Sequence, residues 1–395
     1  MTLDLARIRA GFPALSAGLA HFDSPGGTQT PRPVFEAVTA AMSRPLSNRG
    51  HGNLAQRNAE EIVLGARQAI ADLTGGRPDG VVFGRSATSL TFDFARTLAQ
   101  DWLPGDEVVV SRLDHDANIR PWVTAAEGRG AVVRWVDFDP ATGELEVERG
   151  AGVLTERTRL VALTAASNLI GTRPDIAAVA ELVHRAGALL WVDGVHYAAH
   201  AQIDVAALGC DFFVCSPYKF FGPHHGALVA DPARLTDLHP EKLLPSSDAV
   251  PERFELGTLP YEVLAATTAA IDYLAGLAPG TGSPRERLAA SHAAAEEHET
   301  RLVRRIEDGL AERGATLYSR ARRRTSTLLF DLPGRDAADV AATLAEQGVN
   351  APAGHFYALE ASRHLGLGDR GAVRVGLAPY NDDGDVDRLL TGLAA

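Results

Sequence analysis

The most conspicuous absence in this sequence is that of lysine. The 395-residue chain has 38 lysines and arginines, and the lysines among them are Lys219 and Lys242 alone. Arginine replaces lysine on most surfaces, but its guanidinium stays protonated and cannot form an imine with a carbonyl group. A chain that has exchanged nearly every lysine should retain one where imine chemistry requires it. Chance survival is the alternative, and we prefer it for Lys242.

Cysteine, positive charge and long apolar segments are also scarce. Cys210 and Cys215 lie close together around a predicted strand, so we expect neither a disulfide nor a metal pair. A formal net charge of −12 argues against a nucleic-acid or anionic-membrane partner, and the cluster Arg320–Arg324 is interpreted as a solvated loop. No apolar run reaches about 18 residues and no export signal is visible, which predicts a soluble cytoplasmic protein.

What is present indicates a large α/β protein. With 46% hydrophobic residues, the chain has ample material for a sizeable core. From residue 81, short apolar runs alternate with segments of helical periodicity, which predicts a mostly parallel sheet. The predicted strands are residues 81–83, 107–110, 131–136, 160–164, 188–192 and 211–215.

The composition changes near residues 251–260. Helical segments follow at 262–277 and 284–313, and then come two shorter strand and helix units. We therefore predict a large domain of residues 15–260 and a smaller α+β domain formed by residues 261–395 together with residues 1–14.

Polar residues follow several of the predicted strands. The segment 86–88 and the residues His115, Asn168, Asp193 and Lys219 each come just after one. Ligands of open α/β sheets bind at the carboxyl ends of the strands. We therefore expect these residues to converge on one crevice.

Asp193 and Lys219 indicate a particular cofactor. Asp193 closes a buried strand, where a carboxylate needs a cationic or hydrogen-bonding partner. A protonated pyridine nitrogen would be such a partner, and a facing lysine would form a Schiff base with an aldehyde, as pyridoxal 5'-phosphate (PLP) requires. A helix-capping role explains Asp193 alone equally well. The scarcity of lysine favours the cofactor.

Other residues near these strand ends suit the rest of such a cofactor. The segment 84–89 would place the backbone N–H groups of Ala87 and Thr88 at a helix N-terminus, which suits a phosphate, and Ser216 and Thr258 offer hydroxyl groups. Three more residues are candidates for contacts with the ring, namely His115, Asn168 and His196. Taken singly, each of these residues is better explained by a structural role.

Taken together, the residues resemble the class V aminotransferase superfamily of PLP enzymes, and most closely its cysteine desulfurase-like branch. The resemblance covers nearly the whole chain. It rests on DHDANIRPW (114–122), SNLIGT (167–172), VDGVHYAAH (192–200), SPYK (216–219), FELGT (254–258) and RVGLAPYN (374–381). It implies the type I fold of PLP-dependent transferases and a homodimer with active sites at the subunit interface.

The resemblance also implies a role for each site residue. Lys219 would hold the cofactor as a Schiff base, Asp193 would partner the pyridine nitrogen, and His115 would stack on the ring. Asn168 and His196 would lie beside the ring oxygen, and Thr88 and Ser216 would bind the phosphate. Thr258 would reach the phosphate bound in the partner subunit, and Arg374 would bind the substrate carboxylate.

Two positions depart from the desulfurase pattern. Tyr218 stands where desulfurases have histidine, so one phosphate contact would be a phenol. The segment 354–357, GHFY, places Tyr357 where the pattern has its persulfide-forming cysteine. Neither Cys210 nor Cys215 replaces that cysteine, because both belong to the region leading into the lysine loop.

These departures decide the activity that we expect. The hypothesis is a PLP lyase that removes the β-substituent of a cysteine-like or other β-substituted amino acid by α-proton abstraction and β-elimination. Desulfurase-type sulfur transfer, transamination and epimerisation are the alternatives, and a non-catalytic PLP-binding protein is the third class. The outer pocket wall would come from residues 22–29, 49–51 and 355–357, with the candidate substrate contacts Arg49, His51, His355 and Tyr357.

Overall fold

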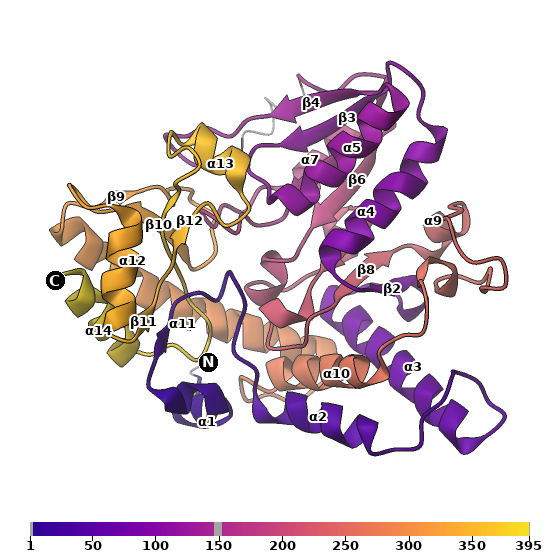
Figure 1. Ribbon diagram of the computed structural model, residues 1–395, viewed down its shortest axis with the longest axis horizontal. Coiled ribbons are helices and arrows are strands. Elements are labelled where there is room, and N and C mark those ends of the chain that lie inside the picture. Colours follow the sequence, from indigo (N-terminus) through magenta and orange to yellow (C-terminus); the bar gives the residue numbers. More distant parts are fainter. Residues whose placement is uncertain (1–2, 146–151, 395) are drawn as a thin grey trace.

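The computed structural model describes residues 3–145 and 152–394, and its centre is a seven-stranded sheet (Figure 1). The strands occur in the order β2-β8-β7-β6-β5-β3-β4. Their bounds are β2 (Val81–Gly84), β3 (Glu107–Ser111), β4 (Val132–Val136), β5 (Thr158–Thr164), β6 (Leu189–Asp193), β7 (Phe212–Cys215) and β8 (Gly226–Ala230). Only β8 among these is antiparallel to its neighbours, β2 and β7. The predicted α/β class and mostly parallel sheet are confirmed, and β8 was missed.

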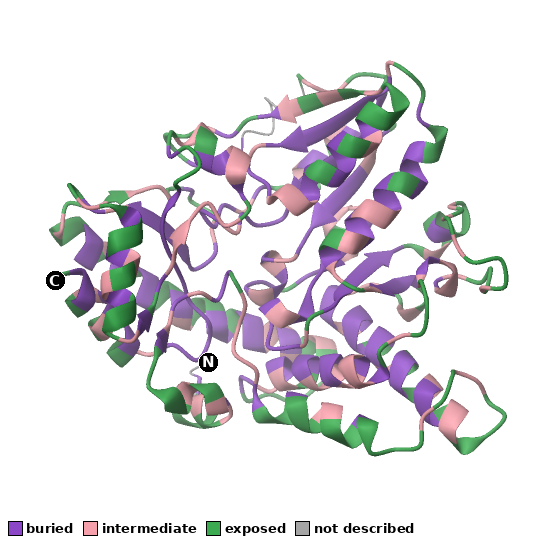
Figure 2. Cartoon of the chain, in the orientation of Figure 1, coloured by how far each residue is buried: buried purple, intermediate pink, exposed green. Residues whose placement is uncertain are grey.

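The central strands of this sheet are buried on both faces, because alternate residues point to opposite sides and helices cover each side. On one face Trp191 of β6 packs against Trp122 of α5 (Arg120–Arg129) and Phe94 of α4 (Ala87–Leu98), with ring centroids 5.0 and 5.7 Å apart. On the other face Leu190 and Val192 join the core cluster of α7 (Ile176–Arg185). Figure 2 shows the resulting buried strands between partly exposed helices.

The C-terminal part of the chain builds a second, four-stranded sheet of order β12-β13-β10-β9. Its strands are β9 (Thr316–Leu317), β10 (Thr327–Asp331), β12 (Ala353–Gly354) and β13 (Ala372–Gly376), and a separate pair joins β1 (Ala20–His21) to β11 (Val349–Asn350). The helices around them are α1 (Leu5–Ala10), α11 (Pro284–Glu312), α12 (Ala337–Glu346), α13 (Leu359–His364) and α14 (Asp383–Leu393).

A third group of helices lies below β2 and β8 of the large sheet in the view of Figure 1. In it α10 (Tyr261–Ala275) packs against α2 (Arg32–Met42) and α3 (Leu54–Thr74). Two short helices, α8 (Val205–Leu208) and α9 (Pro232–Thr236), complete the described chain. None of the helices in residues 3–145 and 152–394 is long and apolar enough to cross a membrane. The domain division at residue 260 stays a prediction.

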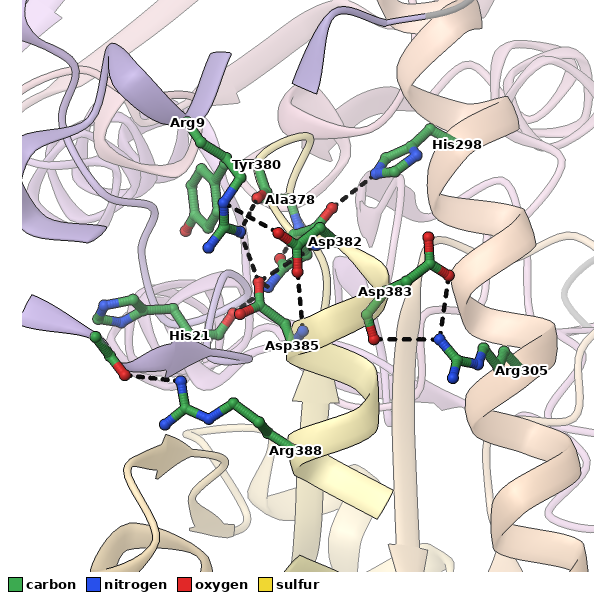
Figure 3. Close-up of polar contacts among 12 residues, drawn as sticks. Arg9, His21, His298, Arg305, Ala378, Tyr380, Asp382, Asp383, Asp385 and Arg388 are labelled. Atoms are coloured by element: carbon green, nitrogen blue, oxygen red, sulfur yellow. Dashed lines mark hydrogen bonds and ion pairs between the residues drawn. The ribbon is translucent and has the colours of Figure 1, made fainter. Parts of the chain in front are cut away.

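An ion-pair network ties the N-terminal helix to α14 (Figure 3). Arg9 contacts Asp385 at 2.9 Å and Asp382 at 3.1 Å. Asp385 also accepts a hydrogen bond from Asn381 at 3.3 Å and completes the capping box at the start of α14. The side chain of Asp385 is only 5% exposed, so these bonds are shielded from water.

Replacing Asp385 with alanine should therefore lower the free energy of unfolding by about 2 kcal/mol, because the half-buried Arg9 loses one of its two carboxylate partners and the capping box loses its second bond. Urea denaturation measures the loss. The matched control is Asp387→Ala on the same helix, whose carboxylate pairs with Arg305 but is 62% exposed. That change should cost less than about 1 kcal/mol. Equal losses in the two variants would contradict this account of the network.

Candidate active site

A cavity of about 710 Å³ lies at the carboxyl edge of the large sheet. Thr164, Asp193 and Ser216, at the ends of β5, β6 and β7, form part of its wall. The predicted site residues that line it are Ala87, Thr88, His115, Asn168, Asp193, His196, Ser216, Tyr218, Lys219, Tyr357 and Arg374. The expected convergence of strand ends is what the structure shows, whereas each residue's role toward a ligand stays a prediction.

Lys219 lies in a short 3-10 turn that follows β7. Its Nζ donates hydrogen bonds to the carbonyl oxygens of Pro25 and Gly26, the latter at 3.1 Å. The side chain is buried, and this burial, with the positive charge of Arg374 nearby, lowers the pKa of Lys219 to about 7. The amine is thus available in its neutral, nucleophilic form near neutral pH.

Asp193 is the last residue of β6 and is buried. Its Oδ1 accepts a hydrogen bond from the backbone N–H of Val195 at 2.8 Å. Burial raises the pKa of Asp193 to about 6, although the nearby charge of Lys219 acts in the opposite direction. A carboxylate held in this way favours a positively charged hydrogen-bond donor as its further partner.

Phe356 and Tyr357, from the predicted wall segment 355–357, form one side of the cavity. The ring of Tyr357 is stacked on His115, with centroids 5.5 Å apart and an interplanar angle of 26°. Phe356 and Tyr357 have φ angles of 50° and 60°, an uncommon left-handed conformation for residues with side chains. Two hydrogen bonds hold the backbone in this conformation. Asn168 Nδ2 donates to the Phe356 carbonyl at 2.9 Å, and the Asp116 N–H donates to the Tyr357 carbonyl at 2.7 Å.

His115 is held as a neutral ring in the same wall. Its Nδ1 accepts a hydrogen bond from the backbone N–H of Ala117 at 3.0 Å. Burial and the charges of Lys219 and Arg374 lower the pKa of His115 to about 4. The adjacent Asp114, which the sequence did not single out, is buried and bonded to Ser111 Oγ at 2.7 Å. A neutral, fixed imidazole suits stacking on a flat ring.

The start of α4 forms another part of the wall. Ser86 caps this helix through a capping box with Ser89, and Ala87 and Thr88 follow in the first turn. The first backbone N–H groups of a helix lack intrahelical partners and attract anions. Close packing holds this turn in place, since a Cβ at Gly226 would lie 2.4 Å from the carbonyl carbon of Ser86.

Arg374 lies on β13 and reaches into the cavity from the smaller sheet. Its Nη1 donates to the carbonyl of Asn168 at 3.0 Å, and its Nη2 pairs with Asp23. The guanidinium also lies 3.6 Å from the ring centroid of Phe356. A fully buried guanidinium with one carboxylate partner is a strong site for a second carboxylate.

Comparison with known proteins identifies the family. The family model for aminotransferase class-V matches residues 20–389. The chain belongs to the class-V aminotransferases. It is 34% identical over the full length of both chains to an uncharacterized protein of Mycobacterium tuberculosis, and 32% identical to a probable cysteine desulfurase of Pseudomonas aeruginosa, covering 98% of this chain and 96% of that one.

A solved structure agrees with these relatives. The cysteine desulfurase CsdA from Escherichia coli, determined with an S-sulfonic acid, superimposes with a TM-score of 0.87 at 28% identity, over 100% of this chain and 98% of that one. This class-V aminotransferase is therefore a PLP-dependent, cysteine desulfurase-like enzyme with the type I fold. The predicted family, fold and cofactor are confirmed.

The cavity of this class-V aminotransferase fits PLP by its own chemistry. Lys219 offers a neutral amine, Asp193 a buried carboxylate and the start of α4 an anion site. In addition, Oδ1 of Asn168 is buried and has no hydrogen-bond partner among the residues that the structure describes, which leaves an acceptor for the ring hydroxyl. These residues would hold the cofactor.

The lowered pKa of Lys219 predicts how the cofactor-free protein takes up PLP. Only the neutral amine attacks the aldehyde, so the rate of incorporation should rise with pH through a midpoint near 7. Stopped-flow absorbance at saturating PLP measures this profile. A midpoint near the ordinary lysine value of 10.5 would contradict the proposed environment of the amine.

Several predicted site residues lie elsewhere in this chain. Arg49 forms ion pairs with Glu60 at 2.9 Å and Glu252 at 3.0 Å, outside the cavity. The cavity lining also excludes His51, His355 and Thr258. Of these, His51 and Thr258 are exposed. His196 lines the cavity, but its Nε2 contacts the hydroxyls of Thr325 and Thr327 at 3.0 Å each. The roles assigned to these residues stay predictions.

Proposed function

We propose that this class-V aminotransferase is a lyase that cleaves the bond to the β-substituent of a cysteine-like or other β-substituted amino acid by elimination. The observation that carries the proposal is Tyr357 at the cavity wall, in the loop where desulfurases carry their reactive cysteine. Without a thiol at this point the enzyme has no group to accept sulfur from the substrate. The substituent must then leave with the bonding electrons and a proton.

The two cysteines of the chain support this proposal, since neither lines the cavity. Burial raises the pKa of Cys210 and of Cys215 to about 12 each. A thiol with so high a pKa is almost entirely protonated at neutral pH, whereas the thiolate is the nucleophile in sulfur chemistry. These side chains are core groups in the region around β7.

The reaction needs a base, a proton holder and a carboxylate site. When bound, PLP withdraws electrons from the α-carbon of the amino acid attached to it. The Nζ of Lys219 would take the α-proton and hand it to the leaving group. Asp193 keeps a proton on the ring nitrogen, and Arg374 orients the substrate by its carboxylate. Hydrolysis of the unsaturated amine that leaves the enzyme gives a keto acid and ammonia.

The proposal predicts that thiol reagents leave the activity unchanged. We expect treatment with iodoacetamide to alter the rate of keto-acid release from a panel of β-substituted amino acids by less than about twofold, because neither thiol is reactive. The double variant Cys210→Ser, Cys215→Ala should likewise retain activity. Loss of activity on alkylation in step with modification of one cysteine would contradict the elimination mechanism and favour sulfur transfer.

We propose further that the enzyme is a homodimer. In support of this, Thr258 and the neighbouring Leu256 are exposed, with Leu256 62% exposed, as expected of a segment that reaches into a partner's site. Sedimentation analysis tests the assembly. A monomer that is fully active at nanomolar concentration would contradict it.

A further inference from the structure

A second cavity, of about 420 Å³, lies behind the catalytic one. One face of α11, the long orange helix of Figure 1, forms one wall, and Thr325 and Ser326 before β10 form the other. His200 separates the two cavities, because its ring packs edge-to-face on His196 of the catalytic cavity at 4.7 Å. No step of the proposed reaction uses this second cavity.

The inner wall of the second cavity holds a carboxylate that is only partly satisfied. Oε2 of Glu299 accepts a hydrogen bond from Ser326 Oγ at 2.6 Å and lies 3.1 Å from Nδ1 of His200. Glu299 is 3% exposed and His200 is 7% exposed. Nevertheless Oε1 of Glu299 and Nε2 of His200 have no partner among the residues that the structure describes. Such atoms are costly to bury.

Their chemistry selects a particular ligand group. Nδ1 of His200 faces a carboxylate and is the donor of that contact, and in the tautomer with its proton on Nδ1 the unpartnered Nε2 is an acceptor. Glu299 Oε1 is also an acceptor. Two neighbouring acceptors, one of them charged, fit the several N–H bonds of an ammonium group.

The outer wall has the opposite character, with five arginines. Two of these arginines form ion pairs with glutamates of the same cavity, Arg173 with Glu296 at 3.0 Å and Arg324 with Glu307. The other three belong to the same rim, namely Arg304, Arg322 and Arg323.

Among these three arginines, Arg304 forms no ion pair with any residue in the described ranges. Arg322 and Arg323 each form a long ion pair of 3.7 Å, with Glu144 and Asp175, which lie outside the cavity. Arg304 follows Glu299 by five residues on α11, about 7.5 Å along the helix axis. Both residues line the same cavity, so one small molecule bound there can contact both.

We propose that this second cavity binds a free amino acid, with its ammonium group on Glu299 and His200 and its carboxylate on Arg304 and the neighbouring arginines. The proposal does not depend on the reaction at the catalytic cavity. It accounts together for the unsatisfied acceptors of the inner wall and for Arg304, the rim cation without a carboxylate partner among the described residues.

Titration calorimetry on holoenzyme reduced with borohydride tests the proposal, since the reduced link between Lys219 and the cofactor can no longer exchange with an amino acid, and the variants below separate the two cavities. L-Glutamine is the probe, glutaramate is the same molecule without the amine, and γ-aminobutyramide is the same molecule without the carboxylate. We expect saturable binding of glutamine and about tenfold weaker binding of each truncated probe, the cost of one charge-assisted contact. Absence of saturable glutamine binding would overturn the proposal.

Three variants locate the binding. Glu299→Gln keeps the size and the bond to Ser326 but loses the charge, and Arg304→Gln removes an exposed cation that does not support the fold. Each should weaken glutamine binding about tenfold. Arg287→Gln, on the same helix but outside the cavity, is the matched control and should bind as the parent does. Unchanged binding in Arg304→Gln would show that glutamine binds elsewhere.

Discussion

Replacement of Lys219 with alanine should lower turnover by about four orders of magnitude, because the change removes both the imine-forming amine and the base that moves the α-proton. No other lysine can replace it, because Lys242, the second lysine of the sequence, does not line the cavity. Keto-acid release measures the rate, and borohydride followed by mass spectrometry measures the covalent link. The variant should bind PLP without forming that link.

Lys242 provides the control for this prediction. It is the only other lysine of the sequence, and it pairs with Asp248, whose side chain is 89% exposed. Lys242→Ala should leave both the rate and the covalent link unchanged. Full activity in Lys219→Ala would contradict the mechanism and would favour a protein that binds PLP without using it in catalysis.

Asp193→Asn should lower the catalytic rate by about three orders of magnitude while making the cofactor-free protein more stable. The loss of rate follows because asparagine does not hold a proton on the ring nitrogen. The gain in stability follows because burial raises the pKa of Asp193 to about 6. The folded state thus disfavours the charged carboxylate above the unfolded pKa, and this cost, on the order of 2–3 kcal/mol, is present at neutral pH.

The opposite signs of these two effects separate a catalytic role from a structural one. Urea denaturation of the cofactor-free protein at pH 8 and at pH 4 measures the stability. The advantage of Asp193→Asn should be large at pH 8 and should shrink toward pH 4, where the parent carboxyl is protonated in the folded state. A variant that is less stable and fully active would contradict the assigned role.

The large sheet was predictable because its central strands are buried on both faces. All six predicted strands formed, and residues 108–110 of the run 107–110 are all valine, which suits a buried strand. β8 escaped prediction because it returns antiparallel after the lysine loop and has no helix before it. The strands β1, β9, β11 and β12 have two residues each, too few for any periodicity to appear.

The site was predictable where it depends on strand ends and not where it depends on tertiary contacts. Asp193 and Lys219 follow parallel strands, whose carboxyl ends share one edge. The pairing of Arg374 with Asp23 joins residues 351 positions apart and leaves no local signal. The same is true of Arg49, which we expected at the pocket but which pairs with Glu60 and Glu252.

The central claim is elimination without an enzyme thiol, and the products formed from L-cysteine test it most directly. Elimination converts cysteine and water into pyruvate, ammonia and sulfide, whereas desulfuration leaves alanine and transfers the sulfur to an enzyme cysteine. We expect pyruvate, ammonia and sulfide in equal amounts, with the same yield from the variant that lacks Cys210 and Cys215. Formation of alanine together with a persulfide on either cysteine would contradict the account.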